Sequence, residues 1–547
     1  MELECLPIST MPGTTALFRD FADTSAAASS EIRRWYPTNP FLMGWADTSP
    51  SLGEDRRTLL ADTLREQAIH FGAGEKALAN IERLRQGAAA VVTGQQVALF
   101  GGPLLTLLKA ATAIRKAQIA TETSGREHVP IFWLASEDHD LAEVDQVVLL
   151  SKTKVEALSL GLQSARPSPV GNLRVDGDDG QGIKHLESAL NQAAELLGWA
   201  PICDLLRECY VPGATLASAF GRLLTKIFAS HGLIVMDAAS RAFHAMGADV
   251  LRAALERADE LEDALLVRSQ DLEAAGYHAQ VLVTADHSLL FLIDSETGAR
   301  LPLRRTPENA WKAGASIYST QELLRILASE PERLSPNALL RPVFQDAILP
   351  TAAYIGGPAE IAYFAQSEVL YSRILGRVTP VLPRLMATLV EPTVAASMAT
   401  HEVQFPQLFE AKTVEALALR LGARAMPVEG KRKIAAAGNA MDAELTALTE
   451  YLTAMSSDLG RAAGVSASKM RYQMNRLRRM AANFELQRQA SLLKQAQIIM
   501  LNLYPDGHLQ ERVLGGIWFL GRYGDSLPSL LVDHAAQECP GHRVIYL

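Results

Sequence analysis

Four ionisable residues, Glu137-Asp138-His139-Asp140, follow the most apolar stretch of the chain, IFWLAS. A strand that ends in such a group places it at the carboxyl edge of a sheet, where open α/β proteins form their ligand crevice. Crowded carboxylates can hold a histidine for acid–base work, or they can hold Mg²⁺. In a structural alternative, Ser136 caps a helix whose dipole favours the acids. That alternative leaves His139 unexplained, so we predict Asp138, His139 and Asp140 as catalytic.

A glycine-rich corner provides a second candidate site, in the segment VVTGQQVALFGGPLLTLLKA. A β-type run reaches a turn there, and Gly-Gly-Pro opens a helix, whose unpaired N–H groups and dipole favour a bound anion. The segment is neither a Walker loop nor a G-x-G-x-x-G fingerprint. A tight turn that needs glycine for close packing is the rival interpretation. We predict anion binding by Thr93, Gly94, Gln95, Gln96, Gly101, Gly102 and Lys109.

A similar corner returns later in the chain as ILPTAAYIGGPAEIAYFAQ, which combines aromatic, anion-binding and acidic groups. A plain turn is again the alternative. Upstream of it, Arg341 is either a clamp for a substrate carboxylate or one half of a surface ion pair. We predict substrate or anion binding by Arg341, Tyr354, Gly356, Gly357 and Glu360.

Composition limits the classes of function. A chain of 547 residues is too long to fold around one hydrophobic core, and this length suggests roughly three or four domains. With 52 basic and 61 acidic residues the net charge is −9, so no overall positive field recruits nucleic acid. The four cysteines form no C-x-x-C pair, which predicts no disulfide framework and fits a reducing cytoplasm. The histidines lack a zinc spacing, so we expect no zinc. We expect neither a signal peptide nor a membrane span, because no run of about 18 apolar residues occurs.

The elements that must position these residues follow from the apolar pattern. The runs AAAVV, VPIFWLA and LIVMDAA each precede a helical segment. The same pattern resumes at Arg341–Gly357 and at TPVLPRL. Such alternation predicts an α/β protein with a mostly parallel sheet, interrupted by two insertions. The second insertion has two apolar runs and a turn, as in a hairpin or meander.

A helical domain is predicted after the sheet. Leu445, Leu448, Leu452, Met455 and Leu459 have coiled-coil spacing, and so do Met470, Met474, Leu477, Ala481 and Phe484. We expect an antiparallel helical hairpin and, at HRVIYL, a last strand that returns to a sheet. The predicted divisions are core 1–150, first insertion 151–210, core 211–265, second insertion 266–335, core 336–395, coiled coil 396–505, and returning segment 506–547.

Five phrases together identify a resemblance that no single one would carry: VVTGQQVALFGGPLLTLLKA, VPIFWLASEDHD, NALLRPVFQDAILPTAAYIGGPAEIAYFAQ, TPVLPR and NLYPDGHLQERV. In this order they span nearly the full length, and the chain resembles the cysteine ligase family of bacillithiol biosynthesis. The resemblance implies a Rossmann-like core with connecting insertions and a C-terminal coiled coil that forms a homodimer. It also implies that the carboxyl of cysteine is joined to the amino group of glucosaminyl malate.

The resemblance suggests a mechanism for these residues. We expect ATP, with Mg²⁺, to activate cysteine, and His139 with Asp138 or Asp140 to deprotonate the attacking amine. The glycine corners would hold phosphate or malyl carboxylates, and Glu360 and Arg341 would orient the amino sugar. A second polar patch is predicted at Gln510, Glu511 and Arg512. The alternatives are a nucleotidyltransferase with another acceptor and a non-catalytic coiled-coil protein that binds a ligand.

Overall fold

The computed structural model describes residues 4–23, 32–36, 43–48, 50–164, 166–177, 182–284, 287–536 and 539–547. The chain divides into two compact units, each with segments that are distant in sequence. The first unit contains Met1–Ser151, Glu156–Thr388 and Glu511–Val544. The second contains Lys152–Val155, Leu389–Gln510 and Ile545–Leu547. No helix within the described ranges has the length and apolar character needed to cross a membrane.

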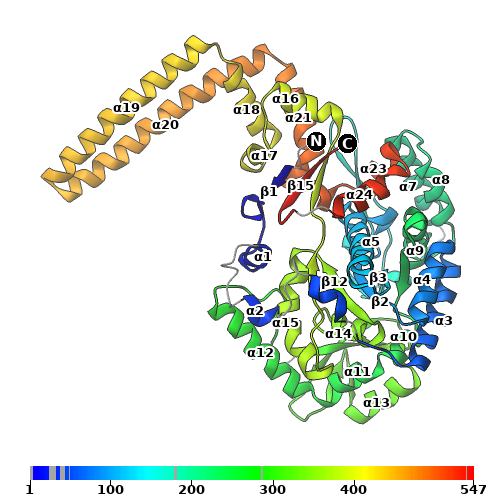
Figure 1. Ribbon diagram of the computed structural model, residues 1–547. Coiled ribbons are helices and arrows are strands. Elements are labelled where there is room, and N and C mark those ends of the chain that lie inside the picture. Colours follow the sequence, from blue (N-terminus) through cyan, green and yellow to red (C-terminus); the bar gives the residue numbers. More distant parts are fainter. Residues whose placement is uncertain are drawn as a thin grey trace. The chain divides into compact units, whose positions relative to one another are not determined.

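A five-stranded parallel sheet forms the centre of the first unit, with the strand order β13-β12-β2-β3-β6 (Figure 1). Taken along the chain, this order places the first strand in the middle and reverses direction beside it, as in a Rossmann-like sheet. The prediction of a Rossmann-like α/β core is therefore confirmed. The strands are β2 (Ala89–Gln96), β3 (His128–Ala135), β6 (Ile234–Asp237), β12 (Thr351–Gly356) and β13 (Val381–Pro383).

The carboxyl ends of β2, β3 and β12 meet at one edge of this sheet. Gln96 at the end of β2 is in register with Ala135 at the end of β3, and Thr93 is in register with Ile355 of β12. Helix α5 (Leu105–Ser124) leads from β2 back to β3, and α15 (Pro358–Ile374) follows β12. The three candidate segments therefore share one edge, with β2 between the other two strands.

Other helices of the first unit surround the sheet or belong to the insertions (Figure 1). Those before β6 are α1 (Ala16–Ala22), α2 (Ile32–Trp35), α3 (Glu54–His70), α4 (Glu75–Arg85), α6 (Leu141–Val144), α7 (Gly182–Leu197), α8 (Ile202–Cys209) and α9 (Leu216–Ile227). Those after β6 are α10 (Arg241–Met246), α11 (Ala248–Glu256), α12 (Ala258–Ala274), α13 (Thr320–Ser329), α14 (Arg341–Ile348), α22 (Gln510–Val513), α23 (Gly516–Tyr523) and α24 (Ser526–Ala536).

The insertions carry sheets of their own. At the start of the first, β4 (Val147–Leu150), which precedes the predicted boundary at 151, pairs with β5 (Val155–Leu158) in a two-stranded sheet. The second holds an antiparallel sheet of order β10-β9-β8-β7-β11, which confirms the predicted meander. Its strands are β7 (His287–Ile293), β8 (Arg300–Arg305), β9 (Trp311–Ala313), β10 (Ser316–Tyr318) and β11 (Leu334–Pro336).

A small three-stranded sheet of order β1-β15-β14 contains the predicted last strand, which therefore does not join the parallel sheet. Its strands are β1 (Glu4–Leu6), β14 (Ala387–Val390) and β15 (His542–Tyr546). Beside it, Cys5 and Cys539 form a disulfide with their Cα atoms 5.9 Å apart. This pairing corrects the expectation that the chain has no disulfide, whereas Cys203 and Cys209 are free and buried. Spacing in the sequence gave no sign of the bond because 534 positions separate its partners.

The second unit is helical, and its longest elements are α19 (Val428–Met455) and α20 (Ser457–Arg488), which run antiparallel (Figure 1). Arg471 on α20 pairs with Asp442 on α19 at 2.9 Å. The hairpin itself is as predicted, but most of the predicted apolar seam is not buried within it. The remaining helices are α16 (Pro392–Thr400), α17 (Phe405–Ala411), α18 (Val414–Ala425) and α21 (Ser491–Leu503).

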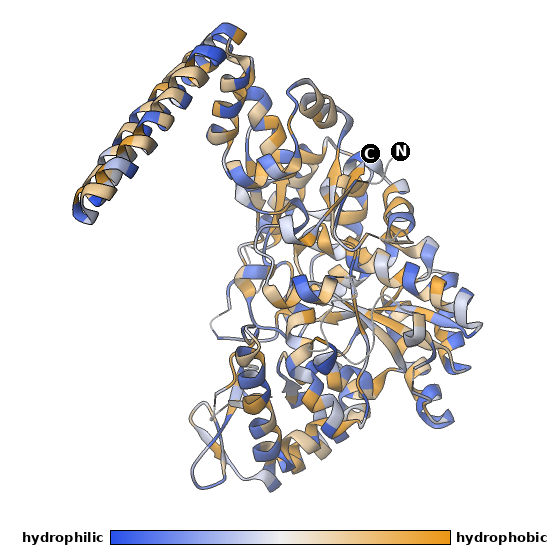
Figure 2. Cartoon of the chain, turned by 60° about the vertical axis from the view of Figure 1, so that its left-hand side comes forward, coloured by the Kyte–Doolittle hydropathy of each residue, from blue (hydrophilic) through white to orange (hydrophobic). Residues whose placement is uncertain are grey.

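Small residues form much of the contact between the two long helices. Gly438 lies against Arg478, Gly460 lies against Thr453, and Ala467 is buried. Two helices that approach closely on small residues bury a narrow face and leave larger apolar residues outside. Figure 2 shows apolar residues along both helices. The exposed ones include Leu448, Met455, Leu459, Met470, Leu477 and Phe484.

Candidate functional site

The two predicted catalytic aspartates order the turn after β3. Asp138 accepts a hydrogen bond from the His139 backbone N–H at 2.7 Å through Oδ1 and one from Gln96 Nε2 at 2.5 Å through Oδ2. Asp140 is exposed and caps α6 by accepting the Glu143 N–H at 3.2 Å. Asp138 therefore joins the turn to β2, and Asp140 has the helix-capping role of the structural alternative.

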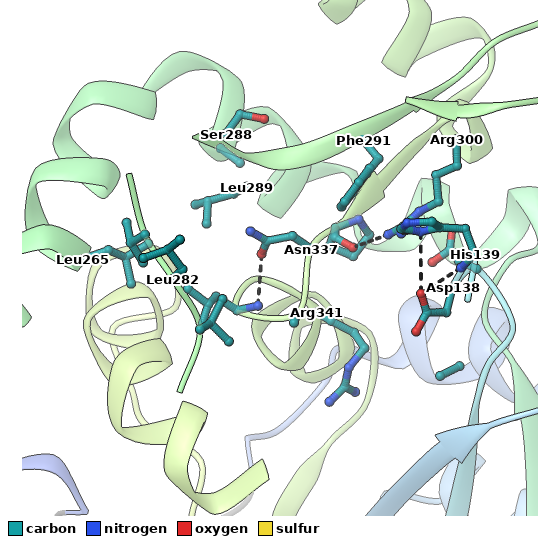
Figure 3. A pocket seen from close by; sticks show the side chains of 18 of the residues that line it. Asp138, His139, Leu265, Leu282, Ser288, Leu289, Phe291, Arg300, Asn337 and Arg341 are labelled. Atoms are coloured by element: carbon teal, nitrogen blue, oxygen red, sulfur yellow. Dashed lines mark hydrogen bonds and ion pairs between the residues drawn. The ribbon is translucent and has the colours of Figure 1, made fainter. Parts of the chain in front are cut away.

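A cavity of about 420 Å³ opens beside this turn, between the end of β3, the insertion sheet and the segment before α14 (Figure 3). Its wall includes apolar side chains such as Leu265, Leu282 and Phe291. Such a wall with few polar groups is typical of small-molecule sites. The polar side chains that matter for chemistry are Glu137, Asp138, His139, Arg300, Asn337 and Arg341.

Arg300 of β8 is the cation closest to His139, and the sequence analysis did not select it. Its guanidinium lies over the Phe291 ring at 3.7 Å and donates to Ser335 Oγ at 3.0 Å and to the Pro336 carbonyl at 3.1 Å. It also donates to His139 Nδ1 at 3.1 Å (Figure 3). The residue is only 7% exposed, and no described carboxylate is close enough to form an ion pair with it. Burial lowers the pKa of Arg300, against the charges of Glu137 and Asp138.

Glu137 forms a buried pair with His244 of α10, another residue that the sequence analysis missed. His244 Nε2 lies 3.0 Å from Glu137 Oε1, and the His244 side chain has no exposed surface. Burial acts to lower the pKa of His244, but Glu137 and the carbonyls of Pro331 and Leu334 outweigh it, so the pKa is raised. No sequence spacing could indicate this pair, because the tertiary fold brings α10 to β3.

The first glycine corner is closed by the backbone of the returning segment at Leu514 and Gly516. Leu104 donates its N–H to the Leu514 carbonyl at 2.8 Å, and Gly516 donates to the Gly102 carbonyl at 3.0 Å. Gly102 has φ +68°, and an added Cβ would lie 2.9 Å from Ala98 Cβ. These contacts favour the packing interpretation over the predicted open anion cradle for Gly101 and Gly102.

Lys109 reaches across β2 from α5. Its Nζ donates to the Gly94 carbonyl at 2.7 Å and to Gln95 Oε1 at 2.9 Å, and it pairs with Glu360 at 2.5 Å. Thr93 donates its hydroxyl to the Ile355 carbonyl at 2.9 Å, within the sheet. Burial lowers the pKa of Lys109, and Glu360 opposes that effect.

At the second glycine corner, the anion at the helix N-terminus is the protein's own Glu360. Its carboxylate accepts the Gly357 N–H at 2.8 Å and the Tyr354 hydroxyl at 2.6 Å, as well as pairing with Lys109. Burial raises the pKa of Glu360, but Lys109 and these donors outweigh it and hold the pKa below its usual value. Glu360 occupies the position that the sequence analysis assigned to a ligand, and Gly356 is buried at the end of β12.

Arg341 joins the cavity to this corner. It lines the cavity, donates to the Tyr363 hydroxyl at 2.7 Å, and lies over the Tyr354 ring at 5.6 Å. Burial acts to lower the pKa of Arg341, but Tyr363, Tyr354 and Glu360 outweigh it, so the pKa is raised. The predicted clamp is therefore a half-buried cation that lines the cavity.

The predicted polar patch near the C-terminus separates into three roles. Glu511 forms a two-pronged buried pair with Arg384, at 2.6 and 3.0 Å. Gln510, which belongs to the second unit, bonds the backbone of Leu389 on both sides at 2.8 Å. Arg512 is exposed, and Arg384, Glu511 and Glu360 all act on its charge.

The candidate residues of the first unit thus form one connected site at the sheet edge. Gln96 links the first corner to Asp138, and Lys109 links it to the second corner through Glu360. Among the residues that the structure describes, no three His, Cys, Asp or Glu side chains converge as metal ligands.

Comparison with known proteins places the whole chain. Residues 1–385 match the family model described as "Bacillithiol biosynthesis BshC, N-terminal Rossmann-like domain", and residues 387–547 match its "C-terminal coiled-coil domain". Relatives named "Putative cysteine ligase BshC" include one from Koribacter versatilis, 41% identical over 99% of both chains. Another, from Solibacter usitatus, is 34% identical over 100% of both, and one from Chlorobaculum tepidum is 33% identical over 86% of this chain and 85% of its own. With two family models covering nearly every residue, the chain belongs to the BshC family of bacillithiol biosynthesis.

Proposed function

We propose that this protein is a ligase that joins the carboxyl of cysteine to the amino group of glucosaminyl malate. The observation that carries the proposal is the cavity at the sheet edge, which is lined by both the guanidinium of Arg300 and the carboxylate of Glu137. Both substrates carry ammonium and carboxylate groups, so a pocket with one charge of each sign is complementary to them. The cysteine ligase name of the relatives supports the same chemistry.

The malyl group supplies two carboxylates, and we assign them to the guanidinium face of the cavity. Arg300 and Arg341 both line it, and a planar guanidinium can grip a carboxylate through two parallel hydrogen bonds. The Phe291 ring fixes the plane of Arg300 before any ligand arrives. Asn337 lies on the same wall and provides a neutral amide for the sugar hydroxyls (Figure 3).

Activation of the cysteine carboxyl requires a leaving group, which we propose comes from ATP with Mg²⁺. The closed glycine corners offer no open helix N-terminus for its phosphates. A cationic cluster beside them suits a phosphate chain better, because four cations there share the two carboxylates Glu360 and Glu511. The cations are Lys109, Arg341, Arg384 and Arg512. Bound ATP would supply the phosphate or nucleotide that leaves when the amide forms.

The test is a reaction of the purified protein with cysteine, glucosaminyl malate and ATP-Mg, with the product thiol followed by mass. We expect the amide in the complete mixture and none without ATP. Arg300→Met should reduce product formation strongly, whereas Glu143→Gln, an exposed acid on α6, should not. Release of pyrophosphate without any amide would instead support nucleotide transfer to another acceptor.

We also propose that the second unit forms a homodimer through the α19–α20 hairpin. Its exposed apolar side chains suit a second copy of the same hairpin, because burying them removes apolar surface from water. Leu477→Glu should shift the mass in light scattering from dimer to monomer, and the exposed polar control Gln473→Glu should not. A wild-type monomer would contradict this part of the proposal. A cytoplasmic location belongs to the same proposal, and cell fractionation tests it.

A further inference from the structure

We propose that Glu137, held by His244, accepts the proton of the attacking amine, and that His139 does not. The inference rests on the proposed ligase function, because it assigns a residue to the step in which the amide forms. It also changes the assignment made from sequence, where His139 was the expected base. Three independent contacts support it: those of His139, of the two aspartates, and of His244.

The contact with Arg300 fixes the protonation state of His139. A guanidinium can only donate hydrogen bonds, so His139 Nδ1, 3.1 Å from Arg300 Nη1, must accept. The neutral ring then carries its hydrogen on Nε2, the nitrogen that would otherwise be free to take a proton. Asp138 Oδ1 lies farther from Nδ1, at 3.6 Å, and already accepts the His139 backbone N–H. His139 is therefore a hydrogen-bond donor toward any ligand.

The aspartates of the same turn already have structural partners. Both oxygens of Asp138 accept hydrogen bonds, from Gln96 and from the His139 N–H. Asp140 caps α6, is exposed, and is not among the residues that line the cavity. Glu137 is the remaining acid of the group, it lines the cavity, and its side chain is 16% exposed.

His244 presents a cation to Glu137 from behind. Its Nδ1 lies 3.0 and 3.2 Å from the carbonyls of Leu334 and Pro331, which only accept, so Nδ1 must carry hydrogen. Its Nε2 faces Glu137 Oε1 at 3.0 Å without the alignment of a full hydrogen bond. A second proton on this ring makes the contact an ion pair, which leaves the other carboxylate oxygen to receive a proton from the cavity.

Several charged groups lie near Glu137. His244 and Arg300 are cationic neighbours, and Asp237 interacts with Glu137 as a like charge. Glu137 and the two carbonyls raise the pKa of His244 against burial, a direction that agrees with the geometry. The other charged or titratable groups on the cavity wall are Asp138, His139, Glu262, Arg305 and Arg341.

The step balances as follows. The ammonium of the amino sugar loses one proton to water, and the resulting amine attacks the activated cysteine carbonyl. The C–N bond forms, and the second nitrogen proton moves to Glu137. The bond from carbon to the leaving phosphate or nucleotide then breaks, and its electron pair departs with that group. Glu137 finally releases the proton to water and is ready for another cycle.

The decisive variant is Glu137→Gln, which keeps the shape of the side chain and removes the base. We expect kcat to fall by about 10²- to 10⁴-fold, with log kcat now rising in proportion to pH because hydroxide replaces the carboxylate. Glu143→Gln is the matched control, and its rate and pH profile should equal those of the wild type. A Glu137→Gln profile that keeps the wild-type plateau and rate would overturn the proposal.

His244 is a positioning residue, and its readout is the pH profile. His244→Gln removes a cation beside Glu137, so the acid limb of kcat should move to higher pH while the plateau remains. A merely structural loss would lower the rate equally at every pH. His139→Gln should leave the midpoint of the acid limb where it is, whatever its effect on the rate. A midpoint that moves only in His139→Gln would return the role to His139.

These outcomes separate the inference from the function on which it rests. If the wild-type protein makes no amide from the three reactants, the ligase proposal fails before any variant is tested. If the wild type makes the amide and Glu137→Gln matches it, the ligase stands and the inference fails. Because His244 is fully buried, thermal melting must show that His244→Gln is folded. If it is not, Glu137→Gln carries the test alone.

Discussion

Two polar clusters at the edge of the same sheet use the same residue types in opposite ways. At the strand-order reversal, Lys109 pairs with Glu360 and Arg384 pairs with Glu511, so each buried charge has a partner of opposite sign. In the cavity, Arg300 bonds only neutral oxygens and an imidazole nitrogen. The first arrangement pairs Lys109 and Arg384 within the protein and leaves Arg341 and Arg512 as its excess cations, whereas the second leaves Arg300 for a carboxylate of a ligand. Composition alone cannot distinguish them.

Because of this difference, variants of the buried pairs should mainly lower the stability of the folded state, and variants of Arg300 should mainly lower ligand binding and catalysis. Removing one partner of a buried pair leaves the other charge without compensation, and that is costly to the folded state. Removing a cation that has no carboxylate partner leaves no such orphan, so the protein should stay folded and bind its ligand poorly.

Lys109→Met should destabilise the protein most, by about 3–5 kcal/mol, because Glu360 would remain buried without its cation. The measurement is the free energy of unfolding in urea. A matched double variant, Lys109→Met with Glu360→Gln, should recover part of the loss, since it removes both charges. If the two single losses simply add in the double variant, the pair is not the closed unit that we describe.

Arg300→Lys should weaken ligand binding and leave stability nearly unchanged. Lysine keeps the positive charge but lacks the planar guanidinium, so the KM for glucosaminyl malate should rise by about tenfold or more. That rise corresponds to a loss of ~1.4 kcal/mol or more of binding free energy. The urea midpoint should change little, because no carboxylate is orphaned. A drop in stability comparable to that of Lys109→Met, with KM unchanged, would show that Arg300 is structural.

The fold could largely be predicted from the sequence, because local patterns determine it. The apolar runs of β2, β3 and β6 and the meander of the second insertion occur where the pattern places them. The seam of the coiled coil was only partly predictable. Spacing identifies which residues share a helix face, but contacts at Gly438 and Gly460 decide which face the partner helix covers.

The sequence could give the location of the candidate site, but it could not show which of its charges lack a partner within the protein. The edge where β2, β3 and β12 end follows from strand order, so the corners and the EDHD turn could be placed together. Which charges are free depends on tertiary partners: Glu360 fills its own helix N-terminus, and Arg300 and His244 arrive from other elements. Single residues that carry no motif leave no signal in one sequence.

The pH dependence of stability offers a finer test of the same contrast. The folded pKa of His244 is raised, so its contribution should be fully present below about pH 6.5 and lost as the pH rises through the folded value. Glu360 and Glu511 have lowered pKa values despite burial, so their contribution should hold above about pH 4.5 and disappear in acid. The free energy of unfolding of wild type minus His244→Gln, measured from pH 5 to 9 (about the range around that pKa), should decline with rising pH. A flat difference would mean that folding does not raise the pKa of His244, and a difference that grows with pH would mean that His244 is neutral in the folded protein.

Variants of Asp140 should have the smallest effect on stability, and they distinguish two interpretations of the turn formed by Glu137-Asp138-His139-Asp140. Its only described bond accepts the Glu143 N–H as the cap of a four-residue helix. Asp140→Ala should therefore cost about 0.5–1 kcal/mol of stability, while Asp140→Asn, which can still cap, should cost less. Neither variant should change the shape of the pH–rate profile. Catalysis that falls with Asp140→Asn as far as with Glu137→Gln would show that the exposed acid takes part in chemistry, and the turn would then open toward its ligand on a different side from the cavity.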